Sequence, residues 1–326
     1  MALPARLARR LRLPLIVAPM LSVSSPQLVI AACRAGAIGA FPTANCRTVD
    51  ELDRWLHEFA SVLGSADAPW CANLVVRRPD LQQHLERLCA HRVELVITSV
   101  GSPKPVVGPL HDAGSLVFAD VATVDHARKA IAAGVDGLVL LSAGAGGQTG
   151  HLNGLAFARA VRRFFDGPLV LAGGIGDGAA LWAATALGCD LGYMGTRFIA
   201  SAESAAPAAY KQMVVDSGID DIELTDAFTG LPANMLTPSL RAAGIALEGI
   251  SPASTAASAA LIFGERDAGE SPRRWRDIWS AGHSVDSADA VLPAAELIEL
   301  TIRQFRAAAA ASLATPWVAA TGDDPP

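Results

Sequence analysis

LVLLSAGAGGQTGH, residues 138–151, joins an apolar run to a helix-patterned segment that starts at about Leu152. Four glycines crowd the turn between the two. Glycine adopts positive φ and lets backbone N–H groups approach a ligand without a Cβ in the way. Between a strand and a helix such a turn favours anions, because free N–H groups and the helix N-terminus both attract negative charge. The stretch therefore predicts a strand–turn–helix unit with a ligand at the turn.

The glycine spacing in this turn differs from that of a dinucleotide-binding loop. Gly144 and Gly146 fit the first two glycines of the G-x-G-x-x-G pattern, but the third comes one residue late, at Gly150. We therefore expect a phosphate site of another kind, with Gln148 and His151 held beside it.

Apolar runs alternate with helix-patterned segments along the first two thirds of the chain. Most of the runs lack polar alternation, which is typical of parallel strands covered on both faces. The eight runs are 15–18, 37–40, 71–76, 95–100, 115–120, 137–142, 169–172 and 191–194, and the helix-patterned segments include 26–35, 49–59, 81–91, 124–133, 157–165 and 179–187. Eight such units predict a (β/α)8 TIM barrel rather than an open sheet.

The local signals at the ends of the helices agree with this pattern. Thr48 and Thr123 stand at N-cap positions. Glycines stand where helices should end, at Gly36, Gly114, Gly134 and Gly188.

The pattern changes after the eighth unit. Residues 220–281 carry four prolines and many small residues, so we expect an irregular inserted lid or small subdomain that shapes the substrate site. We assign 1–219 and 282–326 to the barrel, with a helix over about 290–313 on its outside and a frayed end at 321–326.

Composition excludes several classes of protein. The 326 residues are 51% hydrophobic and carry a net charge of −6, which argues against nucleic-acid binding. We expect no membrane span, because no segment approaches about 18 uninterrupted apolar residues. The basic start of the chain is followed by an apolar run too short for a signal peptide. The five cysteines are scattered and form no C-x-x-C pair, so we expect neither a disulfide framework nor a metal site, and a cytoplasmic location.

Two further glycine clusters lie at expected carboxyl ends of strands. AGGIG, residues 172–176, follows the seventh run, and MGTR, residues 194–197, follows the eighth. The turns after strands seven and eight are the common phosphate position of such barrels. Arg197 could add a charge-assisted contact to the phosphate or form an outer salt bridge.

With these motifs the chain resembles the nitronate monooxygenase family, formerly called 2-nitropropane dioxygenases, whose members are FMN-dependent (β/α)8 barrels. The resemblance covers most of the chain. The stretches that carry it are APM at 18–20, CANL at 71–74, SVGSP at 99–103, AGAGGQTG at 143–150, LAGGI at 171–175, MGTRF at 194–198 and TDAFTGLPAN at 225–234.

The resemblance implies a set of FMN contacts. The phosphate would lie on backbone N–H groups of the turns after strands seven and eight, and the isoalloxazine ring near the turn at 146–148 and the ends of three early strands. Met20 could alternatively pack at the barrel mouth, and Asn73 could cap a strand end. The implied cofactor residues are Ala18, Met20, Asn73, Ser99, Gly146, Gly147, Gln148, Gly150, Ala172, Gly173, Gly174, Gly195 and Thr196.

The chain differs from the family at the position of the catalytic base. Members that oxidise nitroalkanes typically have histidine where this chain has Gln148, and an amide cannot accept the proton α to a nitro group. His151 could reach the same space from the first turn of the next helix, although a histidine there is often simply an exposed polar residue. Gln148 and His151 are therefore the catalytic candidates.

Other polar residues are expected to be structural. Cys46 could lie beside the flavin, but without an adjacent base it is better explained as a small buried hydrophobe. Tyr193 is expected in the core of strand eight. The remaining histidines are expected mostly on the surface: His57, His84, His91, His111, His126 and His283.

The resemblance favours an FMN-dependent oxidoreductase that oxidises nitronates, or a similar electron-rich small molecule, with dioxygen. One alternative is an NAD(P)H-dependent enoyl-thioester reductase. A second is a flavin-free phosphosugar enzyme, which the lack of a lysine at a strand end disfavours. A non-catalytic flavin-binding protein and a homodimer are also open.

Overall fold

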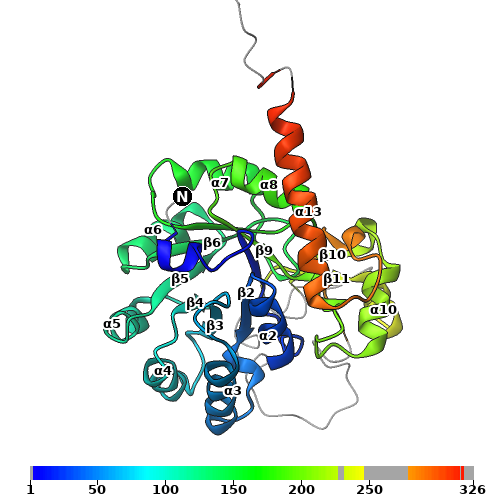
Figure 1. Ribbon diagram of the computed structural model, residues 1–326. Coiled ribbons are helices and arrows are strands. Elements are labelled where there is room, and N and C mark those ends of the chain that lie inside the picture. Colours follow the sequence, from blue (N-terminus) through cyan, green and yellow to red (C-terminus); the bar gives the residue numbers. More distant parts are fainter. Residues whose placement is uncertain (1–2, 227–230, 246–277, 316, 319–326) are drawn as a thin grey trace, which may run out of the picture.

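Eight parallel strands close into a barrel in the computed structural model, which describes residues 3–226, 231–245, 278–315 and 317–318 (Figure 1). Each strand pairs in parallel with the next, and β9 pairs with β1 to close the ring. The strands are β1 (Leu15–Val17), β2 (Ile38–Pro42), β3 (Trp70–Val75), β4 (Leu95–Ser99), β5 (Leu116–Val121), β6 (Gly137–Leu141), β8 (Leu169–Ala172) and β9 (Leu191–Met194). The predicted TIM barrel is confirmed, and every predicted strand is present within two residues.

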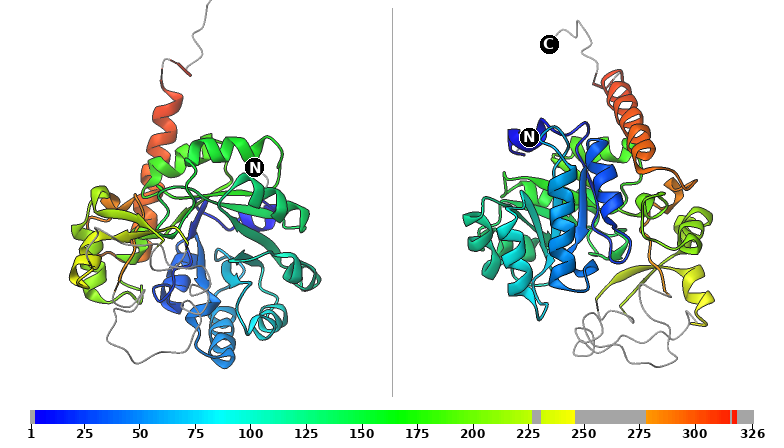
Figure 2. Two further views of the ribbon diagram at one scale, coloured as in Figure 1. Left: turned by 180° about the vertical axis from the view of Figure 1, so that it is seen from behind. Right: turned by 60° about the horizontal axis from the view of Figure 1, so that its bottom comes forward.

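Helices surround this barrel (Figures 1 and 2). They are α2 (Pro26–Arg34), α3 (Val49–Val62), α4 (Leu81–Ala90), α5 (Lys104–Asp112), α6 (Val124–Ala132), α7 (Gly154–Arg162) and α8 (Gly178–Ala186). Thr48 and Thr123 accept hydrogen bonds from the backbone of the first turn, as their positions predict. The periodicity does not predict α5, because Pro105, Gly108 and Pro109 interrupt its pattern.

Two apolar layers hold the barrel together. One layer lies between the strands and the surrounding helices. The other fills the barrel interior with inward side chains such as Ile16, Phe118 and Val139. Leu3 and Leu7, next to and within the short helix α1 (Ala5–Ala8), belong to this inner layer. The amino-terminal segment therefore closes the bottom of the barrel, and the open end lies at the carboxyl ends of the strands.

The segment after β9 is more regular than the sequence predicts. It contains α9 (Thr196–Ile199), α10 (Ala208–Asp216), η2 (Ile219–Asp221), β10 (Ile222–Thr225), β11 (Ala233–Leu236), α11 (Thr237–Ala242) and η3 (Val285–Ser287). The expectation of an irregular segment is thus wrong for 220–226 and 231–245, while 227–230 and 246–277 lie outside the described residues. The pattern of apolar runs misses β10 and β11 because both strands, IELT and ANML, contain polar residues and neither is a continuous apolar run.

The long carboxyl-terminal helix α13 (Ala294–Leu313) lies against the outside of the barrel, as predicted (Figure 1). It packs closely on α8, where a Cβ on Gly178 would lie 2.1 Å from the backbone nitrogen of Phe305. The expected frayed end at 321–326 lies outside the described residues. Among the described helices, none has both the length and the apolar character needed to cross a membrane.

Candidate active site

A cavity of about 350 Å3 opens at the carboxyl ends of the barrel strands. This volume lies in the range of small-molecule sites, and the carboxyl face is where barrel enzymes carry their active sites. Its walls come from the ends of all eight barrel strands and the loops after them, from Tyr210, and from residues within 279–284 of the segment that precedes α13.

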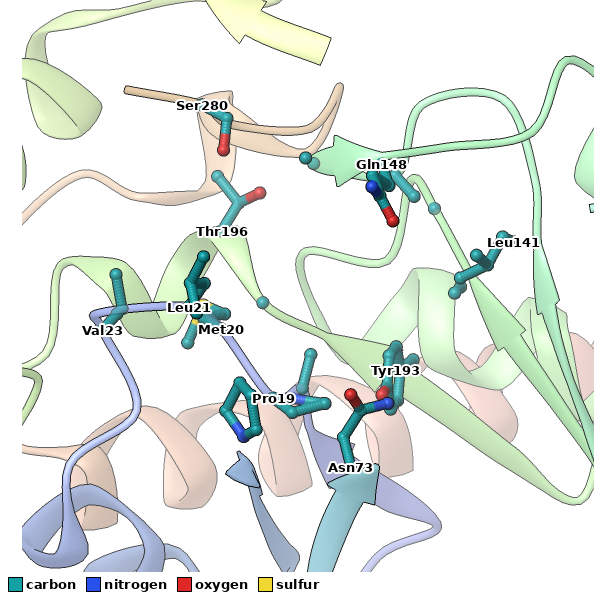
Figure 3. Close-up of a pocket in the computed structure, with 18 of the residues that line it drawn as sticks. Pro19, Met20, Leu21, Val23, Asn73, Leu141, Gln148, Tyr193, Thr196 and Ser280 are labelled. Carbon is teal, nitrogen blue, oxygen red and sulfur yellow. The ribbon is translucent and has the colours of Figure 1, made fainter. Parts of the chain in front are cut away.

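Most of the predicted cofactor residues line this one cavity (Figure 3). Gly150 is the exception among them, and the catalytic candidate His151 also lies outside the lining. The lining members of the predicted cofactor set are Ala18, Met20, Asn73, Ser99, Gly146, Gly147, Gln148, Ala172, Gly173, Gly174, Gly195 and Thr196. The structure therefore brings together residues from six different strand ends.

The turns after β8 and β9 offer backbone donors to the cavity. Gly173 and Gly174 have φ angles of +110° and +74°, and a Cβ on Gly173 would lie 2.6 Å from the Ser142 hydroxyl. In the described part of the chain, the N–H groups of Gly173, Gly174 and Gly195 donate to no other group. Thr196 begins α9, so its N–H has no partner within the helix. These donors can receive an anion.

The glycine turn after β6 is held by the segment that follows β9. Its strand β7 (Gly147–Gln148) pairs antiparallel with β11, and Asn234 donates from Nδ2 to the Ala145 carbonyl at 2.8 Å. This pairing fixes the backbone of Gln148 while its amide points into the cavity from the side opposite Asn73 and Tyr193 (Figure 3). The pairing is invisible in the sequence, because it joins residues more than eighty positions apart.

Gly150 and His151 lie outside the cavity. A Cβ on Gly150 would lie 2.1 Å from the Leu141 carbonyl oxygen, so this glycine allows the turn to pack on β6. His151 is exposed and precedes α7, whose N-cap is Asn153. The prediction that His151 lies in the first helical turn is wrong, because Asn153 accepts from two backbone N–H groups and starts the helix later.

A polar cluster forms the floor of the cavity. Ser99 Oγ donates to Asn73 Oδ1 at 3.1 Å, and Asn73 in turn hydrogen-bonds the side chain of Asp120. Burial raises the pKa of Asp120 to about 7, although the hydrogen bond from Asn73 opposes the shift. Burial also raises the pKa of Tyr193 well above its usual value.

The sequence suggests that Tyr193 is a plain core residue, but in the structure it also lines the cavity. Within the described residues, its hydroxyl oxygen and Asp120 Oδ1 are buried atoms without a hydrogen-bond partner. The residue lies on the inner face of β9, where the barrel interior meets the cavity.

One wall of the cavity is aromatic. Tyr210 from α10 stacks on Trp279, with ring centroids 5.0 Å apart and an interplanar angle of 12°. The Tyr210 hydroxyl donates to the carbonyl of Ser280, which fixes this ring. A flat apolar wall of this kind suits a planar ligand.

Arg78 is the cation among the described residues that line the cavity. Its guanidinium is already bound: it pairs with Asp80 and donates from Nη1 to Thr43 Oγ1 at 3.1 Å and to His84 Nδ1 at 2.9 Å. His84 is buried, so the expected surface position is wrong for this residue. Its ring nitrogen accepts the hydrogen bond from Arg78.

Two further candidates have structural surroundings. Cys46 is buried outside the cavity lining, and burial raises the pKa of its thiol to about 12, which suits the small buried hydrophobe that the sequence favours. Arg197 is buried and donates to the Gly176 carbonyl at 3.2 Å. It supports the turn after β8, lies outside the cavity lining and forms no salt bridge among the described residues, so its surroundings favour neither a phosphate contact nor an outer salt bridge.

Sequence reasoning assigns no role to Asp120, Tyr210 or Trp279, which all line the cavity. Asp120 is visible only as a polar residue at the end of an apolar run, a signal that could have marked it. Tyr210 and Trp279 carry no local motif, because they meet only through the fold.

The barrel and its glycine-lined cavity define a small-molecule-binding barrel of the α/β class. A model of the nitronate monooxygenase family matches residues 8–303 of the sequence, so the chain belongs to this family.

Similar proteins include dehydrogenases and oxidases. The chain is 28% identical over 230 residues to a (3aS,4S,5R,7aS)-5-hydroxy-7a-methyl-1-oxo-octahydro-1H-indene-4-carboxyl-CoA dehydrogenase of Mycobacterium tuberculosis, over 70% of this chain and 64% of that protein. It thus spans less than two thirds of that relative's length. The structures of FabK from Thermotoga maritima (26% identity, TM-score 0.78, 93% of this chain and 96% of that one) and of the nitroalkane oxidase from Streptomyces ansochromogenes (27%, 0.78, 94% and 100%) are similar.

Proposed function

We propose that the protein is an FMN-dependent oxidoreductase that oxidises nitronates, or a similar small electron-rich substrate, with dioxygen. The observation that carries this proposal is the set of backbone N–H groups at Gly173, Gly174 and Gly195 that have no partner in the described part of the chain, which fits a phosphate at the mouth of the cavity. Membership of the nitronate monooxygenase family supports the choice of substrate.

Two groups of cavity residues would bind different parts of the cofactor. Gly173, Gly174, Gly195 and Thr196 would hold the phosphate through their N–H groups. The ring system would lie near Met20, Asn73, Ser99 and the turn at 146–148. When bound, the flavin would accept two electrons from the substrate and pass them to dioxygen.

The substrate itself would meet Gln148. Its amide points into the cavity and can donate to the oxygens of a nitronate, which orients the substrate. A nitronate is already ionised, so it needs no protein base. This matters because, among the described residues, no histidine lines the cavity.

An NAD(P)H-dependent enoyl-thioester reductase is the second candidate. Two observations favour it: the similarity to a carboxyl-CoA dehydrogenase and the presence of glutamine at position 148 instead of the family's histidine. In that case reduced nicotinamide, and not a nitronate, would supply the electrons.

The cofactor can be tested on the purified protein. We expect a visible absorption spectrum typical of a flavin, and FMN as the flavin released on denaturation. A protein that stays colourless and binds no added FMN would overturn the proposal and return attention to the flavin-free phosphosugar alternative.

A further inference from the structure

Asp120 is a carboxyl group in an unusual place for a charge. It lies near the end of β5 and lines the floor of the cavity, directly above the apolar interior of the barrel. Phe118, two residues earlier on the same strand, belongs to that interior, as do Cys71 and Val139. A carboxylate above such a layer is poorly solvated, and its neutral acid form is favoured unless a positive charge compensates it.

No cation pairs with Asp120 within the described residues. Its side-chain partner is the amide of Asn73, whose own oxygen accepts from Ser99 Oγ, so the amide N–H groups remain for Asp120. The titratable groups that face it are Tyr193 on β9 and Cys71 on β3. Burial raises the pKa of both, so both stay neutral near pH 7.

The remaining charge in the cavity is already neutralised. Arg78, the described cation of the lining, is bound by Asp80. Burial holds the pKa of Asp120 near 7, which means that a small change in local charge decides whether this group carries a proton. Asp120 Oδ1 is buried without a partner among the described residues.

We propose that Asp120 is the proton-exchanging residue of the cofactor site, taking one proton from solvent when the bound flavin gains two electrons. The inference rests on the proposed flavin binding, which places the ring beside Asn73 and Ser99, the residues linked by hydrogen bonds to Asp120. Asp120 offsets the negative charge that reduction leaves on the ring, and it does not act on the substrate.

Reduced nicotinamide would supply two electrons and one proton together, as a hydride. A nitronate has no hydride to give: its oxidation with water to a carbonyl compound and nitrite would release two electrons and two protons, of which the ring takes one proton. Either donor would leave one negative charge on the ring. The carboxylate of Asp120 takes one proton from solvent and becomes a neutral acid. The pocket floor therefore gains no second negative charge, which an apolar interior would strongly disfavour.

The experiment measures the reduction potential of the FMN-loaded protein against pH. The wild-type protein should take up one more proton per two electrons above about pH 7 than below it, because Asp120 is ionised there before reduction. Asp120→Asn keeps the shape but cannot ionise, so it should lack the extra proton, and Asp120→Ala provides a second variant without the carboxyl group. Tyr193→Phe is the matched control, because it removes the other polar group at the cavity floor that has no partner among the described residues, and it should keep the extra proton.

An infrared titration of the flavin-free protein gives an independent readout. A carbonyl band of a protonated carboxyl group should disappear as the pH rises through about 7 and should be missing in Asp120→Asn. If flavin binds and is reduced but the wild type and Asp120→Asn take up equal numbers of protons, this inference alone is wrong. If no flavin binds, both this inference and the proposed function are wrong. If the infrared band is absent from the wild type near pH 6, Asp120 is ionised and the inference is also overturned.

Discussion

We propose that Gln148 determines which substrates the pocket can orient. Its backbone is fixed by pairing with β11, while its amide points into the cavity opposite Asn73 and Tyr193. An amide can hold the oxygens of an ionised substrate but cannot remove a proton from a neutral one. A glutamine at this position is therefore compatible with nitronates and disfavours neutral nitroalkanes.

Replacing Gln148 by alanine should slow flavin reduction by a nitronate. A hydrogen bond to a charged group contributes about 1.5–3 kcal/mol, so kcat/KM should fall roughly ten- to a hundredfold. Flavin affinity should change little, because the backbone at 147–148 stays paired with β11. Stopped-flow measurement under anaerobic conditions checks this; unchanged rates would mean that Gln148 does not contact the substrate.

His151→Ala tests the other catalytic candidate. The side chain is exposed and lies outside the cavity, so we expect kcat/KM to stay within about twofold of the wild type. A loss of tenfold or more in the same stopped-flow assay would show that His151 reaches the substrate after all.

A Gly173→Ala variant tests whether the turns at the strand ends hold the phosphate. With φ of +110° and a Cβ that would approach Ser142 and Ala145, Gly173→Ala strains the turn after β8 and displaces its N–H groups. Gly114→Ala is the matched control, since it has φ of +89°, open space around its Cβ and a position at the end of α5, away from the cavity.

Both variants should lose about 1 kcal/mol of folding stability from the left-handed backbone. Gly173→Ala should lose more than the control, because its Cβ would lie 2.6 Å from the Ser142 hydroxyl. Only Gly173→Ala should also weaken FMN binding, by tenfold or more, measured as quenching of flavin fluorescence. Equal FMN affinity in the two variants would contradict the phosphate position.

The contact between α4 and Arg78 should make stability depend on pH. Burial, followed by the charge of Arg78, lowers the pKa of His84 to about 4, compared with about 6.5 in an unfolded chain. Between these values the unfolded chain binds more protons, so the free energy of unfolding should fall as the pH drops from about 6.5 to about 4.

His84→Gln removes this titration. Urea unfolding at a series of pH values should therefore give a shallower pH dependence for the variant in that window. The same slope in both proteins would mean that His84 is protonated in the folded state.

The elements show where sequence reasoning succeeds and where it stops. The strands and most helices are predictable, because apolar runs, N-caps such as Thr48 and terminal glycines such as Gly36 are local signals. Most of the predicted site residues line one cavity for a similar reason, since the barrel gathers all strand ends at one face. The pairing of β7 with β11 and the stacking of Tyr210 on Trp279 are long-range contacts without a local signal.

The whole molecule combines a rigid barrel with a covering segment. The barrel supplies the glycine turns and the polar floor, while β11 and residues 279–284 complete the walls. The assignment of 220–281 as a separate lid stays a prediction. Both parts line the same cavity, in which we propose that the flavin and the electron donor meet. The identity of that donor is therefore the central question for the molecule as a whole.

Anaerobic titration of the FMN-loaded protein, followed by the visible absorbance of the flavin, identifies the electron donor. We expect stoichiometric bleaching by a nitronate, and recovery of the absorbance when dioxygen is admitted. Bleaching by NADH or NADPH with no response to the nitronate would overturn the proposed nitronate oxidation and favour the acyl-thioester alternative.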